Sequence, residues 1–325
     1  MPGEPALIRN ATRKASNLFG LVVYLFLGLL AVVFSILSPS FLTFSNLYGT
    51  ILNGAPLILI ACGINFALLA GTIDLSVAGV GLAAGSLCGI LLKNFHAPIL
   101  IAVCAGLLIA IAFGGINSFL IVRLKLNPII TTLGMMMAIR GIGRVITRDR
   151  LILMGKSVSD LRQMKIGALG GFPVLLFIVF GVVIISQIVL SYTRFGKYLI
   201  AVGCDDKAAR NVGINVERIR TLALIATSFV CGVGGVLWVI SLGAVITRGL
   251  NGYEFLAIAA AVLGGTSLFG GRGSFFPGSF IGALILLFIA DGLTMAGVSP
   301  YVMPFLRGAI IFTAMYVDSL RVRFG

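Results

Sequence analysis

Long apolar stretches follow one another along almost the whole chain, and short polar segments separate them. The stretches approach the roughly 20 residues that a membrane-spanning helix needs, and they lack the alternation of apolar and polar positions typical of transmembrane strands. We therefore expect an all-α, polytopic membrane helical bundle of about ten transmembrane segments, some of them short or broken. The expected segments are 18–37, 54–70, 77–92, 97–121, 129–146, 172–190, 221–242, 254–269, 275–293 and 301–317.

The polar segments indicate which helix ends face the cytoplasm, because Lys and Arg are retained on that side. Basic residues mark the N-terminal segment 1–17, the loops 122–127 and 191–220, and the tail 318–325. An even number of expected spans separates these segments, so all four can face the cytoplasm together. The predicted organisation is a cytoplasmic segment 1–17, a single transmembrane domain 18–317 and a cytoplasmic tail 318–325.

The loop 147–170 conflicts with this rule. It must face outward, because a single span separates it from the loop 191–220, yet this region is strongly basic. The basic residues in and just before the loop are Arg144, Arg148, Arg150, Lys156, Arg162 and Lys165. We keep the loop outside, since early helices usually dominate the orientation. On that side, its positive charge favours binding either to an acidic partner or to the phosphates of membrane lipids.

The composition supports a membrane protein and argues against a nucleic-acid partner. Hydrophobic residues make up 59% of the 325 residues and charged residues 10%, whereas a soluble domain has about 25% charged residues. The net charge of +14 comes from basic residues in short loops and at the ends, without interleaved exposed aromatics. The membrane topology therefore accounts for the charge.

The cysteines and glycines favour packing roles. Cys62, Cys88, Cys104 and Cys231 lie in apolar runs without the spacing of a zinc site, so we expect small buried side chains and no metal. Glycines repeat every fourth position at 81, 85 and 89, and again at 278 and 282. Such spacing lets helix backbones approach closely in lipid.

Asp74 is a candidate functional residue, because a carboxylate near the membrane core is costly. Its neighbours suggest a broken helix whose freed backbone groups face a polar pathway. The alternative is structural: Asp74 caps the following helix or pairs with an arginine. Both interpretations remain open. The candidate pathway residues are Asn65, Thr72, Asp74, Ser76 and Thr132.

Other charged residues within the apolar stretches have simpler interpretations. Glu254 precedes a span and suits the N-terminal end of a helix, and Arg140 is expected to extend toward the membrane interface. Residues 154–157 resemble the end of a P-loop, but Arg150 stands where the first glycine is required. Without a catalytic constellation, the chain itself is predicted not to be an enzyme.

The loop 191–220 holds a short segment, 205–214, with a helix-forming composition. Asp205 or Asp206 can cap its N-terminus, and Gly213 is suited to the position after its C-terminus. We expect a helix of one to two turns along the inner face of the membrane. The small side chains of Ala208 and Ala209 would let it fit into a groove on another protein.

The Ala-Ala pair with a glycine four residues after Ala209 resembles the coupling-helix motif of ATP-binding-cassette (ABC) importer membrane subunits. A wider set of stretches resembles the sugar-importer permease family that includes ribose, xylose, galactose and autoinducer-2 permeases. These stretches are 71–77, 132–134 with 140–141, 194–197, 208–214, 253–268 and 270–273. The resemblance spans nearly the whole chain. This chain departs from the family pattern at Thr72, Ala78 and Gly203-Cys204-Asp205, which leaves the solute open.

The resemblance implies a membrane subunit of an ATP-driven importer in a bacterial inner membrane. It implies three protein partners: a cytoplasmic ATP-binding subunit that carries ATP and Mg, an extracytoplasmic solute-binding protein, and a second permease copy or paralogue. The solute would be a monosaccharide or related sugar. The residues expected to couple to the ATPase are Gly203, Asp205, Asp206, Ala208, Ala209, Gly213 and Ile214.

Other functions remain as alternatives. An ion-coupled secondary transporter would use Asp74 as proton or cation carrier, but it has no need for the coupling motif. An ABC importer of amino acids would share the architecture, and a receptor or scaffold would show no solute flux.

Overall fold

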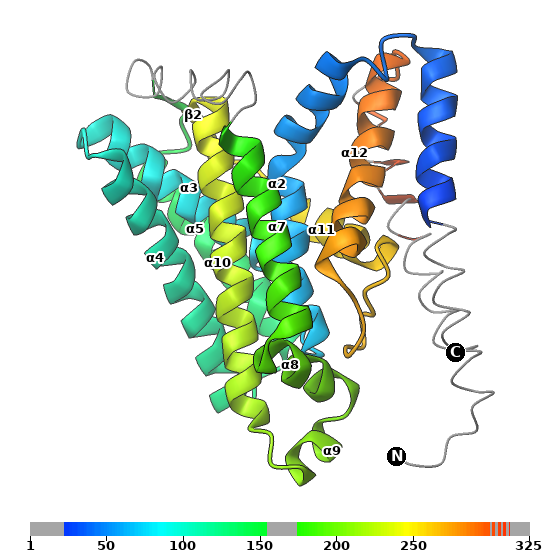
Figure 1. The fold of residues 1–325 in the computed structure, drawn as a ribbon. Coiled ribbons are helices and arrows are strands. Elements are labelled where there is room, and N and C mark those ends of the chain that lie inside the picture. The colour runs from blue at the N-terminus through cyan, green and yellow to red at the C-terminus, as the bar shows by residue number, and fades with distance from the viewer. Residues whose placement is uncertain are drawn as a thin grey trace, which may run out of the picture.

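The computed structural model describes residues 23–154 and 174–299, together with positions 301, 302, 305, 306, 308, 309 and 312. Seven helical segments of this part are long and apolar enough to cross a membrane (Figure 1). They are α2 (Phe44–Leu69), α3 (Val77–Asn94), α4 (Ile99–Ser118) with η1 (Phe119–Arg123), α5 (Pro128–Thr147), α7 (Val174–Tyr192), α10 (Val216–Leu242), and η3 (Phe275–Ser279) with α12 (Phe280–Met295).

Shorter elements complete the described part. They are the apolar helix Val23–Leu37, α8 (Arg194–Cys204), α9 (Asp206–Asn211), α11 (Tyr253–Leu263), β1 (Ile152–Leu153) and β2 (Ala244–Val245). The polytopic helical bundle is confirmed. The predicted N-terminal segment, the tail and most of the tenth expected span lie outside the described residues, so the exact number of spans stays a prediction.

The helix α2 begins about ten residues earlier than the sequence predicted. Thr43 caps it by accepting a hydrogen bond from the Asn46 backbone at 3.4 Å. The polar residues of its first turns find partners on α12: the Asn46 side-chain amide and the Thr50 hydroxyl donate to the Asp291 carboxylate at 2.7 and 3.0 Å. The connection between the first two expected spans, residues 38–53, therefore shrinks to residues 38–43.

The expected span 254–269 is only a half-span. Its helix α11 has 11 residues, which is about 16 Å, roughly half of a hydrocarbon core about 30 Å thick. It ends at Leu263 with Gly264 as its C-cap, and the chain then turns with Gly265 at φ +96°. The chain next runs through residues 266–274 into η3 and α12.

The centre of the bundle is formed by α2 and α10, whose apolar windows are 89% and 72% buried. The helix α10 packs closely against α3, because Gly81 and Gly85 face Gly235 without intervening side chains. A Cβ atom at Gly81 would lie 2.9 Å from the Cys231 carbonyl oxygen. Gly282 similarly faces the backbone of Ala260, which joins α12 to α11. The predicted close packing through glycines is confirmed.

The two ends of the bundle carry different elements. The helix α9 lies at the lower end in Figure 1, and β2 lies at the upper end. Because β1 pairs with β2, with Ile152 opposite Val245, the segment after α5 also lies at the end opposite α9. This arrangement agrees with the predicted opposite sides for the loops 147–170 and 191–220. The basic residues at 156, 162 and 165 lie outside the described residues.

Candidate functional site

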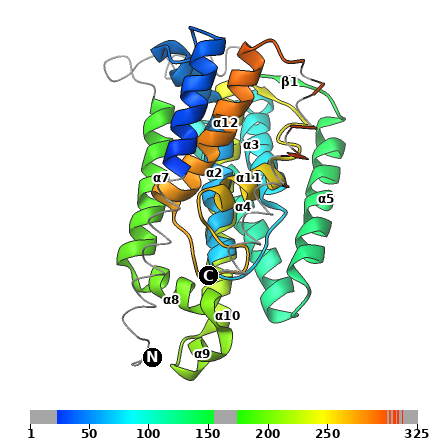
Figure 2. The same ribbon diagram turned by 90° about the vertical axis from the view of Figure 1, so that its right-hand side faces the viewer.

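The loop between α7 and α10 forms two helices that lie across the end of the bundle (Figures 1 and 2). The first, α8, begins where Thr193 accepts a hydrogen bond from the Gly196 backbone at 3.2 Å. Its inward positions are Gly196, Leu199 and Val202, at a helical spacing of three residues. This face packs α8 against the lower ends of the spans and fixes where α9 begins.

The capping of α9 follows the sequence prediction. Asp205 is the N-cap, and its carboxylate accepts hydrogen bonds from the backbones of Lys207 at 2.8 Å and Ala208 at 3.1 Å. Gly213 has φ +81°, and its N–H donates to the Arg210 carbonyl at 3.0 Å. The next N–H, of Ile214, donates to the Ala209 carbonyl at 3.0 Å. These two bonds define a Schellman motif, so both ends of this short helix are closed by its own residues.

The two alanines of the motif do not face the same way. Ala209 is only 3% exposed and packs inward, whereas Ala208 is exposed. The expectation that both fit into a partner's groove is therefore wrong for Ala209. The outer side of α9 is formed by Lys207, Ala208, Asn211 and the following Val212 and Gly213. A Cβ atom at Gly213 would meet nothing within 4 Å, so this edge is open.

Asp206 does not cap α9; instead its side chain connects α9 to the membrane-spanning helices through an ion pair. Its carboxylate pairs with the Arg220 guanidinium at 2.8 Å. Arg220, near the start of α10, also donates to the Ala70 carbonyl at 3.4 Å, just beyond the end of α2. One arginine therefore connects α9 with two central helices.

A second connection is made by backbone alone, at what we call the glycine junction: Gly71, Gly203, Gly270 and Gly271. The Gly271 N–H donates to the Leu69 carbonyl at 3.1 Å. A Cβ atom at Gly270 would lie 2.7 Å from the Gly203 carbonyl oxygen and 2.8 Å from the Gly71 Cα. The end of α8 thus contacts both the turn 70–76 and the loop 264–274 with no side chain between them.

Immediately after Gly71 lies a buried polar group, the Asp74 cluster: Asp74, Ser76, Asn117 and Thr132. One Asp74 carboxylate oxygen accepts from the Ser76 backbone at 2.8 Å and from the Ser76 hydroxyl at 2.6 Å. That hydroxyl accepts from the Asn117 amide at 2.8 Å. The Thr132 hydroxyl accepts from the Leu75 backbone at 3.0 Å. The cluster therefore joins the start of α3 to α4 and α5.

This geometry bears on both interpretations of Asp74. It closes the turn before α3, as the structural interpretation expects, although the N-cap itself is Ser76. Among the ion pairs of the described residues, none includes Asp74. Its second oxygen, Oδ2, and the Asn117 Oδ1 have no hydrogen-bond partner in the described part of the chain. Two buried oxygen atoms can therefore still accept hydrogen bonds.

The five candidate pathway residues are all buried within the chain. Asn65 stands apart from the Asp74 cluster and accepts a hydrogen bond from Thr266, in the loop 264–274, at 2.8 Å. Thr72 lies in the turn between the glycine junction and Asp74, with 4% of its surface exposed. Their role in a solute pathway stays a prediction.

Away from the α9 end, ion pairs hold α5 and the residues just after it to the start of α11 and to the segment between α10 and α11. Arg140 pairs with Glu254 at 2.9 Å, and their side chains are only 18% and 3% exposed. Arg248 pairs with Asp149 at 2.6 Å, and this hydrogen bond lowers the pKa of the exposed Asp149 carboxyl. Thr147 and Thr247 share a hydrogen bond of 2.7 Å.

The expectation that Arg140 extends to the membrane interface is therefore wrong. Its side chain lies inside the protein, because Glu254 offers a buried carboxylate and Leu250 a carbonyl at 3.4 Å. Glu254 does occupy the first turn of α11, as expected. Sequence reasoning missed the pair because 114 positions separate its members. The available signal was two opposite charges within apolar stretches, which are expected to find each other.

The comparisons with known proteins agree with this architecture. Residues 46–315 match the family described as branched-chain amino acid transport system / permease component. The chain belongs to this permease family. The matched region contains α8, α9, the glycine junction and the Asp74 cluster.

The permease is similar to several curated transport proteins over most of its length. It is 33% identical over 299 residues to the ribose import permease protein of Escherichia coli, covering 90% of this chain and 91% of that protein. It is 32% identical to the L-arabinose transport system permease protein of Escherichia coli, covering 94% and 93%. The ribose import permease protein of Bacillus subtilis is 34% identical, with 90% and 91% covered. No solved structure shows a significant match to the permease.

Proposed function

We propose that this permease is the membrane subunit of an ABC importer that translocates a monosaccharide or a related sugar. A separate cytoplasmic subunit carries ATP and Mg and binds α9, and an extracytoplasmic protein delivers the solute. Both termini face the cytoplasm of a bacterium, and the spans cross its inner membrane. The names of the ribose and arabinose relatives support the substrate class.

The observation that carries this proposal is the construction of α9. A helix of six residues is too short to be stable on its own, yet both of its ends are capped and its outer edge is open. It is also connected to the spans through Asp206 and the glycine junction. Such an element is suited to receive a force from a partner and to pass it on.

The connections suggest how ATP drives transport. When the ATP-binding subunits close, they move α9 and the end of α8. The glycine junction passes this displacement to the turn 70–76 and to the loop 264–274, which lead into α3 and α12. ATP and the loaded binding protein each favour one arrangement of the spans, and this differential affinity is the coupling.

A second permease copy would enclose the pathway on the α5 side. The helix α5 is the least buried of the seven spanning segments, yet it is much less apolar than α4 and α7. Its outward face includes Gly134, Ala138 and Gly141 at helical spacing, and small residues are enriched where membrane helices contact each other. We propose that the Asp74 cluster and its neighbours reach the pathway when α5 moves away from the turn 70–76.

The variant Gly213→Asp tests the docking role. It adds a charged side chain to the open edge of α9, at a backbone conformation that aspartate tolerates better than most residues. We expect normal membrane insertion, loss of sugar uptake in reconstituted vesicles supplied with ATP, and loss of the ATPase during purification.

Gly297→Asp is the matched control, because Gly297 has φ +77° and an open surrounding at the opposite end of the bundle. This variant should keep both uptake and the ATPase. An ATPase that still co-purifies with Gly213→Asp would contradict the proposal. Uptake without ATP would favour a secondary transporter, and competition by amino acids but not by sugars would favour an amino-acid importer.

A further inference from the structure

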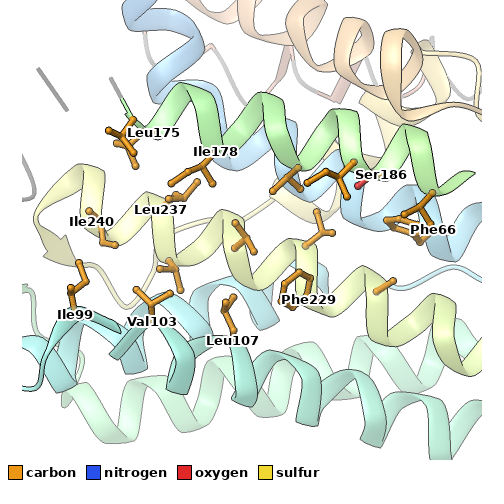
Figure 3. A pocket seen from close by; sticks show the side chains of 18 of the residues that line it. Phe66, Ile99, Val103, Leu107, Leu175, Ile178, Ser186, Phe229, Leu237 and Ile240 are labelled. Carbon is orange, nitrogen blue, oxygen red and sulfur yellow. The ribbon is translucent and has the colours of Figure 1, made fainter. Parts of the chain in front are cut away.

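A long apolar groove lies between α4, α7 and α10, with a cavity volume of about 640 Å³ (Figure 3). Its lining on α10 extends from Ala226 to Ile240, which is about 21 Å along the helix axis. The groove therefore runs through most of a hydrocarbon core about 30 Å thick. Ile99 and Leu175 lie near one end of it, and Phe66 lies near the other.

The chemistry of the groove excludes a polar solute. Ser186 is the one hydroxyl-bearing residue of its lining, and all the other lining residues are apolar. A sugar placed here would lose its hydrogen bonds to water without gaining partners, which costs several kcal/mol. The groove is thus separate from any sugar pathway.

Its surroundings favour lipid over protein. The helices α4 and α7 are the most apolar of the spanning segments, and most of their surface is unburied. Bulky residues such as Leu108, Ile185 and Phe229 are exposed around the groove, with 65%, 61% and 39% of their surfaces accessible. Contacts between membrane helices prefer small residues instead, as on the outward face of α5.

One end of the groove is marked by positive charge. Phe195 of α8 lines the groove, and Arg194, which precedes it, and Lys197, two residues after it, are exposed. With α9 in the cytoplasm, α8 lies at the headgroup level of the inner leaflet; this assignment of sides rests on the proposed function. The cytoplasmic leaflet carries anionic lipids, and basic residues near its surface attract them.

We propose that the groove holds one acyl chain of an anionic phospholipid of the inner leaflet, with its phosphate against Arg194 and Lys197. Such a lipid fills the space between α7 and α10 and fixes α8 against both. Because α8 leads directly into α9, the bound lipid also positions the element that we assign to ATPase docking.

Native mass spectrometry of the purified transporter tests this proposal, with phosphatidylglycerol and phosphatidylcholine added separately as probes. Wild-type protein should retain one phosphatidylglycerol per permease chain and prefer it over phosphatidylcholine. The double variant Arg194→Gln, Lys197→Gln should reduce this preference by about 30-fold, because two basic residues near the headgroup are lost. Arg218→Gln, an exposed arginine that does not line the groove, should leave the preference unchanged.

The apolar part of the site needs its own variant. Val233→Phe places a large ring inside the groove and should remove both lipids, whereas Ile184→Phe on α7, outside the lining, should remove neither. If Val233→Phe does not yield folded protein, Val182→Phe fills the groove from the opposite wall. Equal retention of the two lipids by wild-type protein, or unchanged retention in the groove-filling variant, would overturn the proposal. Lipid retention is measured without solute or ATP, so its outcome is independent of the uptake experiment.

Discussion

The two ends of the permease are held together by different means. At the α9 end, the glycine junction brings three segments into backbone contact, with Gly270 and Gly71 almost touching Gly203. Toward the opposite end, side chains make the connections: Arg140 of α5 pairs with Glu254 of α11, and Asp149, just after α5, pairs with Arg248, in the segment before α11. Because no flexible side chain separates backbone segments in direct contact, a displacement of one segment moves the next. Ion pairs can separate and form again, which suits an end that opens and closes.

The largest effect is expected from breaking the backbone contact. In Gly203→Val the new Cβ atom would collide with the Leu69 carbonyl oxygen. Because backbone cannot rotate away, we expect a loss of about 3 kcal/mol in the free energy of unfolding and no uptake. Thermal unfolding of the purified protein and vesicle uptake measure these effects.

Gly115→Val is the control, since Gly115 lies in α4 with nothing within 4 Å of an added Cβ atom. Normal stability and uptake of Gly203→Val would show that the glycine junction is not the rigid contact described above.

A smaller effect is expected from breaking the buried ion pair. Glu254→Gln leaves the Arg140 guanidinium without a carboxylate, and we expect a loss of about 2 kcal/mol in stability. Uptake should be reduced rather than abolished if this end opens during transport. The double variant Arg140→Leu, Glu254→Leu removes both charges and should recover part of the stability, because a matched apolar pair replaces a buried ion pair at little cost. A double variant less stable than Glu254→Gln would argue against this mutual dependence.

Sequence and structure agree where the controlling interactions are local. The caps of α9 depend on Asp205 and Gly213, which lie next to the helix in sequence. Gly213 was predicted, and the N-cap was predicted to be Asp205 or Asp206. The apolar runs likewise located most of the spanning helices. The early start of α2 was missed because Asn46 and Thr50 look like loop residues until Asp291, about 240 positions later, supplies their partner.

The remaining differences also arise from long-range contacts or from burial that depends on them. The glycine junction joins positions 71, 203, 270 and 271, and no sequence spacing predicts that these positions are in contact. Cys104 was expected to be buried because its surroundings are apolar, but it is exposed. An apolar run in a membrane protein indicates contact with lipid as readily as contact with protein.

The smallest effect is expected from the exposed ion pair. The hydrogen bond from Arg248 lowers the pKa of Asp149 in the folded protein, so its contribution to stability is present above the unfolded pKa. That contribution is lost as the pH falls through the folded pKa. Asp149→Asn should therefore melt slightly below wild type at pH 7 and together with it in strong acid. A difference that grows toward acid would contradict the sign of this shift.

The exposure of the cysteines gives the permease a built-in chemical reporter. Cys62, Cys88 and Cys231 are buried, and Cys104 lies on the lipid side of α4, whereas Cys204 is exposed at the end of α8. Its sulfur lies 3.6 Å from the Gly271 carbonyl oxygen. A water-soluble maleimide, which reacts with thiolate in the aqueous phase, should therefore label Cys204 selectively. If the glycine junction stays closed while the spans rearrange, the labelling rate of Cys204 in the native chain should be the same with and without ATP, without any engineered residue.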